Sequence, residues 1–187
     1  PVKDVTAHPA MRHGAETVAS LYDLQYDASI GRDMTYSSPD TGDLVGLSFI
    51  IPRTVDDLER RRVMMTHWAR RTCGMMGRSP DFLNVMITAL AAKRSFFAER
   101  SEERAEAMVN YYHYIASNDL FLTHALLDPQ LDKGKLRHEQ SDPNICLRVT
   151  DRTAEGLVLN GIKRIATAAP YADELLVWPF PPTFQAG

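Results

Sequence analysis

The chain has 187 residues, 44% of them hydrophobic, which is enough to bury the core of one sizeable domain or of two small ones. Its 21 Lys and Arg against 24 Asp and Glu leave a net charge of −3, which gives no general attraction to nucleic acid or to a membrane surface. Without a membrane-length apolar run, a signal-peptide core or paired cysteines, the sequence predicts a reduced, cytoplasmic protein.

The first seventy residues predict two helices separated by a loop. Pro9 suits a first helical turn, and helical spacing of apolar residues continues to about Tyr26. Residues 36–46 are rich in Ser, Pro, Asp and Gly and predict a loop. Thr54 followed by Asp57 resembles a capping box and opens a helix to about Arg71. One side of that helix carries Leu58, Arg62, Met65 and Trp68.

Two more helices are predicted before residue 120. In Ser79-Pro80-Asp81 the serine can cap a helix, the proline suits its first position and the aspartate complements its dipole. This helix carries an apolar stripe, which predicts core packing, at Phe82, Val85, Met86, Ala89 and Leu90. Ser101 caps the next helix, to about Ser117, with Met108, Tyr112 and Ile115 inward.

After residue 120 the pattern changes to short strands. The apolar run FLTHALL is followed by alternation at Ile145, Leu147 and Val149, again at Leu157 and Leu159, and by a strand from Leu175 to Phe180. Asn160-Gly161 is a strong signal for a two-residue hairpin. The sequence therefore predicts an α+β chain, with a helical domain at 1–119 and an antiparallel meander at 120–187.

Two residues are candidates for chemistry. Arg78 precedes a helix start, where a guanidinium, free backbone N–H groups and the helix dipole would suit a carboxylate, phosphate or phenolate. From local sequence alone, a solvated arginine is the simpler interpretation. His124 lies inside an apolar run that leads into a polar loop, and a satisfied core histidine is the simpler interpretation there. No spacing of His and Cys predicts a metal site, and no Walker or GxGxxG motif occurs.

Five stretches, in order along nearly the whole chain, resemble one family. They are HPAMRHGAETVASLYDLQYD, MTYSSPDTGDLVGLSF, WARRTCGMMGRSPDFLN, THALLDPQLDK and IKRIATAAPYADELLVW. They are similar to the oxygenase component of 4-hydroxyphenylacetate 3-monooxygenase, a two-component, flavin-dependent phenol hydroxylase. The resemblance implies an acyl-CoA-dehydrogenase-like fold, with a helical N-terminal domain, a β middle domain and a C-terminal helical bundle. The bundle has no counterpart in this sequence, so we expect these residues to be part of a longer polypeptide.

The resemblance also implies the site. Arg78 would bind the phenolic oxygen, with Ser79, Pro80, Asp81 and Phe82 as the substrate-contacting segment. Phe82 stands where the hydroxyphenylacetate enzymes carry tyrosine, so a hydroxyl is lost and the phenylacetate substrate itself is put in question. His124 would contact both substrate and flavin. Further flavin contacts are implied at Ala125, Leu126, Gln130, Leu131, Asp132, Lys133 and Thr167.

The chemistry implied is hydroxylation of a 4-hydroxyphenyl compound ortho to its hydroxyl. An NAD(P)H-dependent reductase would supply reduced FAD by diffusion, and O2 would convert it to a C4a-hydroperoxide. The ring carbon beside the phenol oxygen would then attack the distal oxygen of that hydroperoxide. Arg78 and His124 would be the catalytic residues, and the full-length protein would be a homotetramer without metal, nucleic acid or membrane partners.

Other interpretations of the resemblance stay open. The phenol could be tethered to a carrier protein, or halogenated. A related branch of the fold holds FAD/iron–sulfur hydroxyacyl-CoA dehydratases, whose cluster needs three cysteines and a histidine, whereas this chain offers only Cys73 and Cys146. A fourth possibility is a non-catalytic fragment or scaffold.

Overall fold

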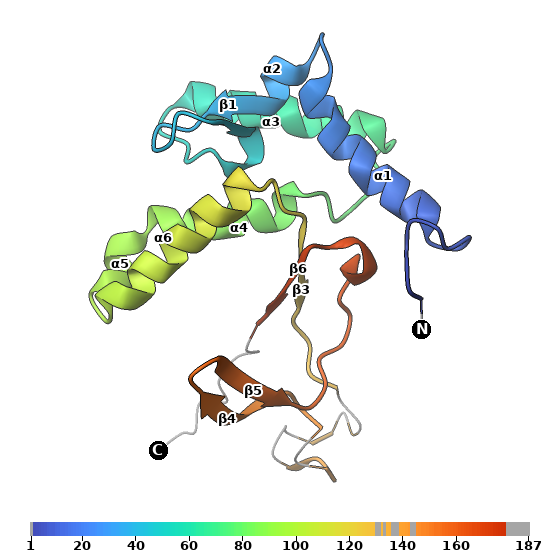
Figure 1. Cartoon of the computed structure of the whole chain (residues 1–187), viewed down its shortest axis with the longest axis vertical. Helices are drawn as coiled ribbons and strands as arrows, with labels where there is room; N and C mark the ends of the chain where they lie inside the picture. The colour runs from blue at the N-terminus through green and yellow to red at the C-terminus, as the bar shows by residue number, and fades with distance from the viewer. Residues whose placement is uncertain (1, 130–131, 133, 136–138, 143–144, 179–187) are drawn as a thin grey trace. The chain divides into compact units, whose positions relative to one another are not determined.

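The structure is a computed structural model that describes residues 2–129, 132, 134–135, 139–142 and 145–178. The chain forms two compact units: Pro1–Leu122 with Pro170–Glu174, and Thr123–Ala169 with Leu175–Gly187 (Figure 1). The first is mainly helical and the second carries most of the strands, which confirms the α+β class. The assignment of residues 1–119 and 120–187 to an N-terminal and a middle domain stays a prediction.

The first unit is built from six α-helices, a small hairpin and short 3-10 turns. The helices are α1 (Arg12–Tyr22), α2 (Gly31–Met34), α3 (Val55–Arg71), α4 (Asp81–Ala92), α5 (Arg94–Ala98) and α6 (Glu102–Ser117). The 3-10 turns are η1 (Asp23–Tyr26) and η2 (Leu47–Phe49); η4 (Ala169–Tyr171) lies where the chain returns to this unit. Its fully buried apolar side chains include Leu21, Met34, Leu47, Phe49, Met64, Leu83, Ile87 and Ile115.

The helix starts follow local capping rules at two of three predicted places. Thr54 and Asp57 form the predicted capping box at the start of α3. The Ser101 side chain accepts a hydrogen bond from the Arg104 N–H at the start of α6. At α4 the N-cap is Pro80, without a side-chain cap, so the prediction that Ser79 caps this helix is wrong; its backbone carbonyl accepts the Phe82 N–H instead.

The buried face of α4 is not the apolar stripe that the sequence suggests. Leu83 and Ile87 are buried, together with the polar Asn84 and Thr88, whereas Phe82 and Val85 are each 40% exposed. The prediction of core packing for Phe82 is therefore wrong within this unit. The helix is apolar nearly all round, and buried hydrogen bonds of Asp81 and Asn84 turn the other face inward.

The same shift occurs on α3. Trp68 is buried as predicted, but its companions on the inner face are Arg61 and Met64 rather than Leu58 and Met65, which are 55% and 45% exposed. Trp68 donates its indole N–H to the Leu21 carbonyl at 3.1 Å, which ties α3 to α1.

Residues 36–46 were predicted to be a loop, and this prediction is wrong at both ends. β1 (Thr35–Ser37) pairs antiparallel with β2 (Leu44–Gly46), with Tyr36 opposite Val45. Tyr36 and Tyr112 of α6 both donate hydroxyl hydrogen bonds to the Phe49 carbonyl, at 3.2 and 2.7 Å. Residues 38–43 form the turn between the two strands, and the hairpin is joined to the core through these tyrosines.

The described residues of the second unit carry two pairs of strands. β4 (Arg148–Thr153) and β5 (Gly156–Asn160) form an antiparallel hairpin, and β3 (Leu122–Ala125) pairs with β6 (Glu174–Val177). Backbone bonds from Asp173 N–H to the Phe121 carbonyl and from Trp178 N–H to the Ala125 carbonyl advance in the same direction along both strands. The strand order in the described residues is therefore not that of a meander, and Phe180 lies outside those residues.

Asn160-Gly161 does not form the predicted hairpin turn, because β4 and β5 are joined at Thr153–Gly156. Gly161 instead follows β5 with φ +117°, and a Cβ there would lie 2.5 Å from the Cys146 carbonyl oxygen. Glycine thus permits a close backbone crossing, after which the Ile162 N–H bonds to the Ile145 carbonyl at 2.8 Å.

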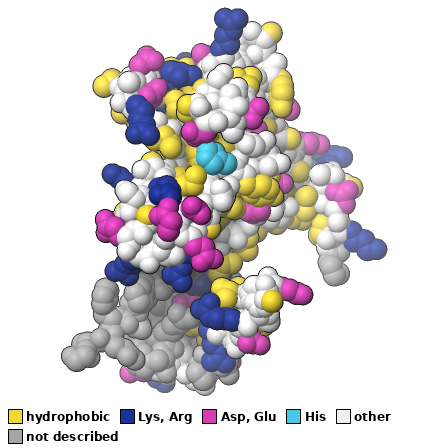
Figure 2. All heavy atoms as spheres, turned by 60° about the vertical axis from the view of Figure 1, so that its left-hand side comes forward, with side chains coloured by type: hydrophobic (Ala, Val, Ile, Leu, Met, Phe, Trp, Pro, Cys, Tyr) yellow, Lys and Arg dark blue, Asp and Glu magenta, His cyan; other side chains and the backbone are white. Residues whose placement is uncertain are grey.

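The face drawn in Figure 2 has a mixed character. Figure 2 shows acidic, basic and hydrophobic side chains interspersed on the face it presents. Within the described parts of the chain, none of the helices combines the length and the apolar composition that a membrane span needs.

Candidate functional site

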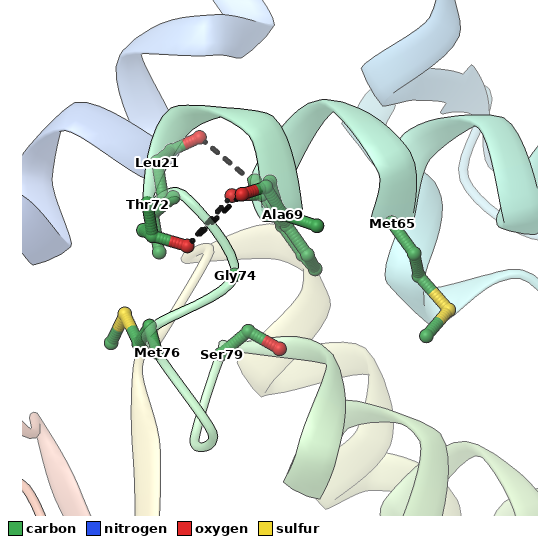
Figure 3. A pocket seen from close by; sticks show the side chains of 8 residues that line it. Leu21, Met65, Ala69, Thr72, Gly74, Met76 and Ser79 are labelled. Atoms are coloured by element: carbon green, nitrogen blue, oxygen red, sulfur yellow. Dashed lines mark hydrogen bonds between the residues drawn. The ribbon is translucent and has the colours of Figure 1, made fainter.

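The segment Arg78–Phe82 follows, after a short connection, a tight turn that ends α3. Cys73 and Gly74 adopt positive φ angles of 52° and 71°, and the Gly74 N–H bonds to the Ala69 carbonyl at 2.8 Å. The Thr72 hydroxyl donates to the Trp68 carbonyl at 3.1 Å, which closes the last turn of the helix (Figure 3). The chain then passes through Met75–Gly77 and enters α4.

A small pocket of about 150 Å³ lies beside this turn, within the first unit. Its lining comes from α1, α3 and the turn: Leu21, Met65, Trp68, Ala69, Thr72, Gly74, Met76 and Ser79 (Figure 3). Of the segment Arg78–Phe82, Ser79 is the member that belongs to this lining. The pocket is smaller than the roughly 300–1,000 Å³ of most small-molecule sites, so it does not by itself define a binding site.

Arg78 and Phe82 lie together on the exposed side of the α4 start. The Arg78 guanidinium carbon is 4.4 Å from the centroid of the Phe82 ring, one turn further along the chain. Both side chains are exposed, and Arg78 Nη1 also donates to the Gly77 carbonyl at 3.4 Å. The arrangement presents a cation and an aromatic face at a helix N-terminus, which is suited to an aromatic anion.

Pro80 and Asp81 of the same segment are buried instead. The Asp81 carboxylate forms a 2.5 Å ion pair with Arg61 of α3, and both side chains are about 10% exposed. Burial raises the pKa of Asp81 above its usual value, and the Arg61 charge opposes that rise. Sequence reasoning missed Arg61; its spacing to Met64 and Trp68 on one helical face was the available signal.

In the second unit, two candidate flavin-binding segments lie side by side. Thr123, next to His124 on β3, donates its hydroxyl to the Thr167 carbonyl. Lys163 donates to the Leu126 carbonyl at 3.1 Å and forms a 2.8 Å ion pair with Asp128, with both charged side chains nearly buried. Thr167 therefore lies beside β3, which carries His124 and Ala125, and Leu126 follows that strand.

The loop that follows is described only in part. Gln130, Leu131 and Lys133 lie outside the described residues, whereas Asp132 is exposed. The buried Gln140 side chain accepts the Asp132 N–H at 3.0 Å and donates to the Asp132 and Lys135 carbonyls. Sequence reasoning missed Gln140, which holds the backbone of this candidate segment and gives no local signal.

Metal ligation finds no support in the described part of the chain. No group of three or more His, Cys, Asp or Glu side chains there could hold a metal ion. Cys73 is exposed in the first unit and Cys146 is buried in the second. The cysteines thus offer no cluster-like arrangement within either unit.

A helical unit followed along the chain by a unit that carries most of the strands agrees with the acyl-CoA-dehydrogenase-like fold. The family described as "4-hydroxyphenylacetate 3-hydroxylase N terminal" matches residues 1–186. The chain belongs to this family.

Relatives are similar over almost all of this chain but are much longer. The 4-hydroxyphenylacetate 3-monooxygenase oxygenase component of Geobacillus sp. (strain PA-9) is 43% identical over 178 residues, 95% of this chain and 36% of the relative. A Streptomyces globisporus monooxygenase named for a carrier-bound 3-chloro-4-hydroxyphenyl substrate is 34% identical, over 96% of this chain and 33% of the relative. The chain thus spans about a third of the length of these relatives.

A solved structure agrees in fold. The crystal structure of a 4-hydroxyphenylacetate 3-monooxygenase oxygenase component, complexed with FAD and 4-hydroxyphenylacetate, superposes with a TM-score of 0.87 at 42% identity. The match covers 95% of this chain and 36% of that one.

Proposed function

We propose that this chain supplies phenol-binding and flavin-binding segments of a reduced-FAD-dependent monooxygenase that hydroxylates a 4-hydroxyphenyl compound ortho to its hydroxyl. The observation that carries the proposal is the placement of Arg78 against the Phe82 ring, exposed at the start of α4. Membership of the hydroxylase family and the relative with FAD and 4-hydroxyphenylacetate bound support it.

Arg78 would bind the phenolic oxygen and favour its ionised form. A phenol has a pKa near 10, and an adjacent positive charge lowers the pKa of such a group. A guanidinium donates charge-assisted hydrogen bonds, and the helix start adds positive potential. The phenolate is the better nucleophile at the ring carbon beside its oxygen, while the Phe82 ring would wall the substrate.

The second unit would bind the flavin. The segment Ala166–Ala169 has small, uncharged side chains and is held against β3 by the Thr123–Thr167 hydrogen bond, which fits the approach of a flat ring. Further contacts would come from His124, Ala125, Leu126, the loop 130–133 and Thr167. Bound reduced FAD would activate O2, one oxygen atom entering the phenol and the other leaving as water. His124 would donate to the substrate and relay its proton.

The same proposal implies partners for the complete protein. A separate NAD(P)H-dependent reductase would supply reduced FAD, and the assembled enzyme would be a homotetramer. Since water at the reacting oxygen releases hydrogen peroxide instead of product, the assembled site must exclude water.

A carrier-tethered or halogenated phenol is the second candidate substrate. Phe82 supplies an aromatic wall without the hydroxyl that the hydroxyphenylacetate enzymes carry there, and its ring is 40% exposed. The Streptomyces globisporus relative is named for a substrate that is both chlorinated and carrier-bound.

The test uses the complete protein that contains this chain, supplied with enzymatically reduced FAD and O2. 4-Hydroxyphenylacetate, a 3-chloro-4-hydroxyphenyl analogue and a pantetheine thioester of the same phenol are compared by catechol formed per O2 consumed. We expect catechol from at least one of them. Hydrogen peroxide alone from all three would refute the hydroxylase. Bound iron with acyl-CoA dehydration would favour the dehydratase branch, and absence of any FAD binding would favour a scaffold.

A further inference from the structure

The buried ion pair beneath the substrate-binding segment connects three elements of the first unit. Arg61 of α3 is 8% exposed; its Nη1 donates to the Ser48 carbonyl in η2 at 2.7 Å, and its Nη2 to Asp81 of α4 at 2.5 Å. Asn84, one turn along α4, donates to the Ser48 hydroxyl at 2.8 Å. The first turn of α4 is therefore fixed by directional bonds as well as by apolar packing.

These bonds set the rotation of α4 about its axis. Successive residues of an α-helix are separated by about 100° around the axis. With Asp81 held inward, Phe82 must point toward the exposed side, where its ring supports the Arg78 guanidinium. The preceding Pro80 is fully buried, so the backbone between Arg78 and Asp81 is also held.

Stability alone does not account for charges at these positions. Removing two charges from water is costly, and an apolar pair of similar volume is often as stable as a buried ion pair or more so. Apolar contacts are not directional, so apolar side chains would allow α4 to slide or to rotate about its axis. The short hydrogen bonds of Arg61 to Asp81 and to the Ser48 carbonyl restrict both movements.

We propose that Arg61 and Asp81 are positioning residues of the phenol site, which fix the rotation of α4 and thereby the places of Phe82 and Arg78. The inference rests on the proposed function. Asp81 then acts through its neighbours and does not itself contact the substrate.

The experiment compares four variants of the complete protein: Arg61→Met, Asp81→Leu, the double variant and Arg62→Met. Arg62 is the matched control, since it lies next to Arg61 on α3 but pairs with Glu59 at the surface, where the side chains are 64% and 53% exposed. Each variant is measured for thermal unfolding, FAD dissociation constant, KM for the best phenol of the panel above, and catechol formed per O2 consumed.

Each single variant leaves one buried charge without its partner and should lower the unfolding temperature, whereas the double variant should recover it. We expect the folded double variant to keep its FAD affinity but to raise the phenol KM about tenfold or more and to release peroxide, since small misplacements of a binding group have large effects. Arg62→Met should change neither the phenol KM nor the amount of peroxide released.

Recovery of the phenol KM and coupling together with stability in the double variant would show that the pair is only structural, and so would overturn the inference. Failure of the double variant to recover stability would also overturn it, because the pair would then be required for folding. If Arg78→Ala leaves phenol binding unchanged, the proposed function itself fails, whatever the double variant does.

Discussion

Replacing Arg78 by alanine separates a role in binding from a role in stability. The guanidinium is exposed and lies 4.4 Å from the Phe82 ring, and exposed cation–π contacts contribute only about 0.5–1 kcal/mol. A hydrogen bond from a charged donor to a phenolate contributes about 1.5–3 kcal/mol, which corresponds to about tenfold to a hundredfold in transition-state stabilisation. We therefore expect a small loss of stability and a large loss of coupled hydroxylation.

The assay follows O2 consumption, catechol and hydrogen peroxide in the complete protein with reduced FAD supplied. Arg78→Ala should still consume O2 but release mostly peroxide. Arg78→Lys keeps the positive charge but not the planar guanidinium, so its yield of catechol per O2 should lie between those of Arg78→Ala and the parent. Arg62→Ala, in the exposed pair with Glu59, serves as the control for removing a surface arginine. Full coupling in Arg78→Ala would refute the role of Arg78.

Four further changes test other parts of the structure. Phe82→Tyr adds a hydroxyl to a ring that is 40% exposed and should change the order of preferred phenols. An order identical to that of the parent would show that residue 82 has only a packing role. Thr123→Val removes the hydrogen bond to the Thr167 carbonyl and should weaken FAD binding about fivefold, for a bond of about 1 kcal/mol; unchanged affinity would count against this segment. Thr54→Ala removes the cap of α3 and should lower the unfolding free energy of the chain by about 1 kcal/mol at neutral pH; no change in a denaturant titration would contradict it. Backbone hydrogen bonds from Arg53 and Thr54 lower the pKa of Asp57. The contribution of this carboxylate to folding stability should therefore be present above about pH 4 and be lost as pH falls through the lowered pKa. A loss of stability in Asp57→Asn that does not depend on pH would contradict this expectation.

Local signals in the sequence predicted what local chemistry decides. The capping box of Thr54 and Asp57 and the Ser101 cap need only residues three apart, and both form. Arg78 precedes the start of α4 as predicted, because Pro80 and Asp81 suit that position whichever face of the helix is buried.

Local signals of this kind could not predict which face of α4 is buried. Its sequence is apolar on two faces, so periodicity alone does not choose between Phe82 and Leu83. Arg61 and Ser48, which lie 20 and 36 residues away from their partners on α4, make the choice. A polar network among distant residues thus overrides an apparently clear apolar stripe.

The prediction of the strand pairing was wrong for a similar reason. Asn160-Gly161 has the composition of a hairpin turn, yet the chain uses Gly161 to let its backbone approach Cys146 closely. β3 pairs with β6, some fifty residues later, and no short-range pattern specifies that partner. The contact between Thr167 and Thr123 depends on the same long-range arrangement.

The two candidate segments are held in the same way, although they belong to different units. A buried cation from a neighbouring element binds each segment: Arg61 pairs with Asp81 below the phenol segment, and Lys163 pairs with Asp128 beside the flavin segment. In each case the same cation also donates to a backbone carbonyl, which fixes its direction as well as its charge. Arg78 and Phe82 of the phenol segment and Thr167 of the flavin segment remain exposed. Burial therefore divides the residues of the candidate segments into two groups: exposed residues, which are accessible to a ligand, and buried residues, which are bonded to neighbouring elements.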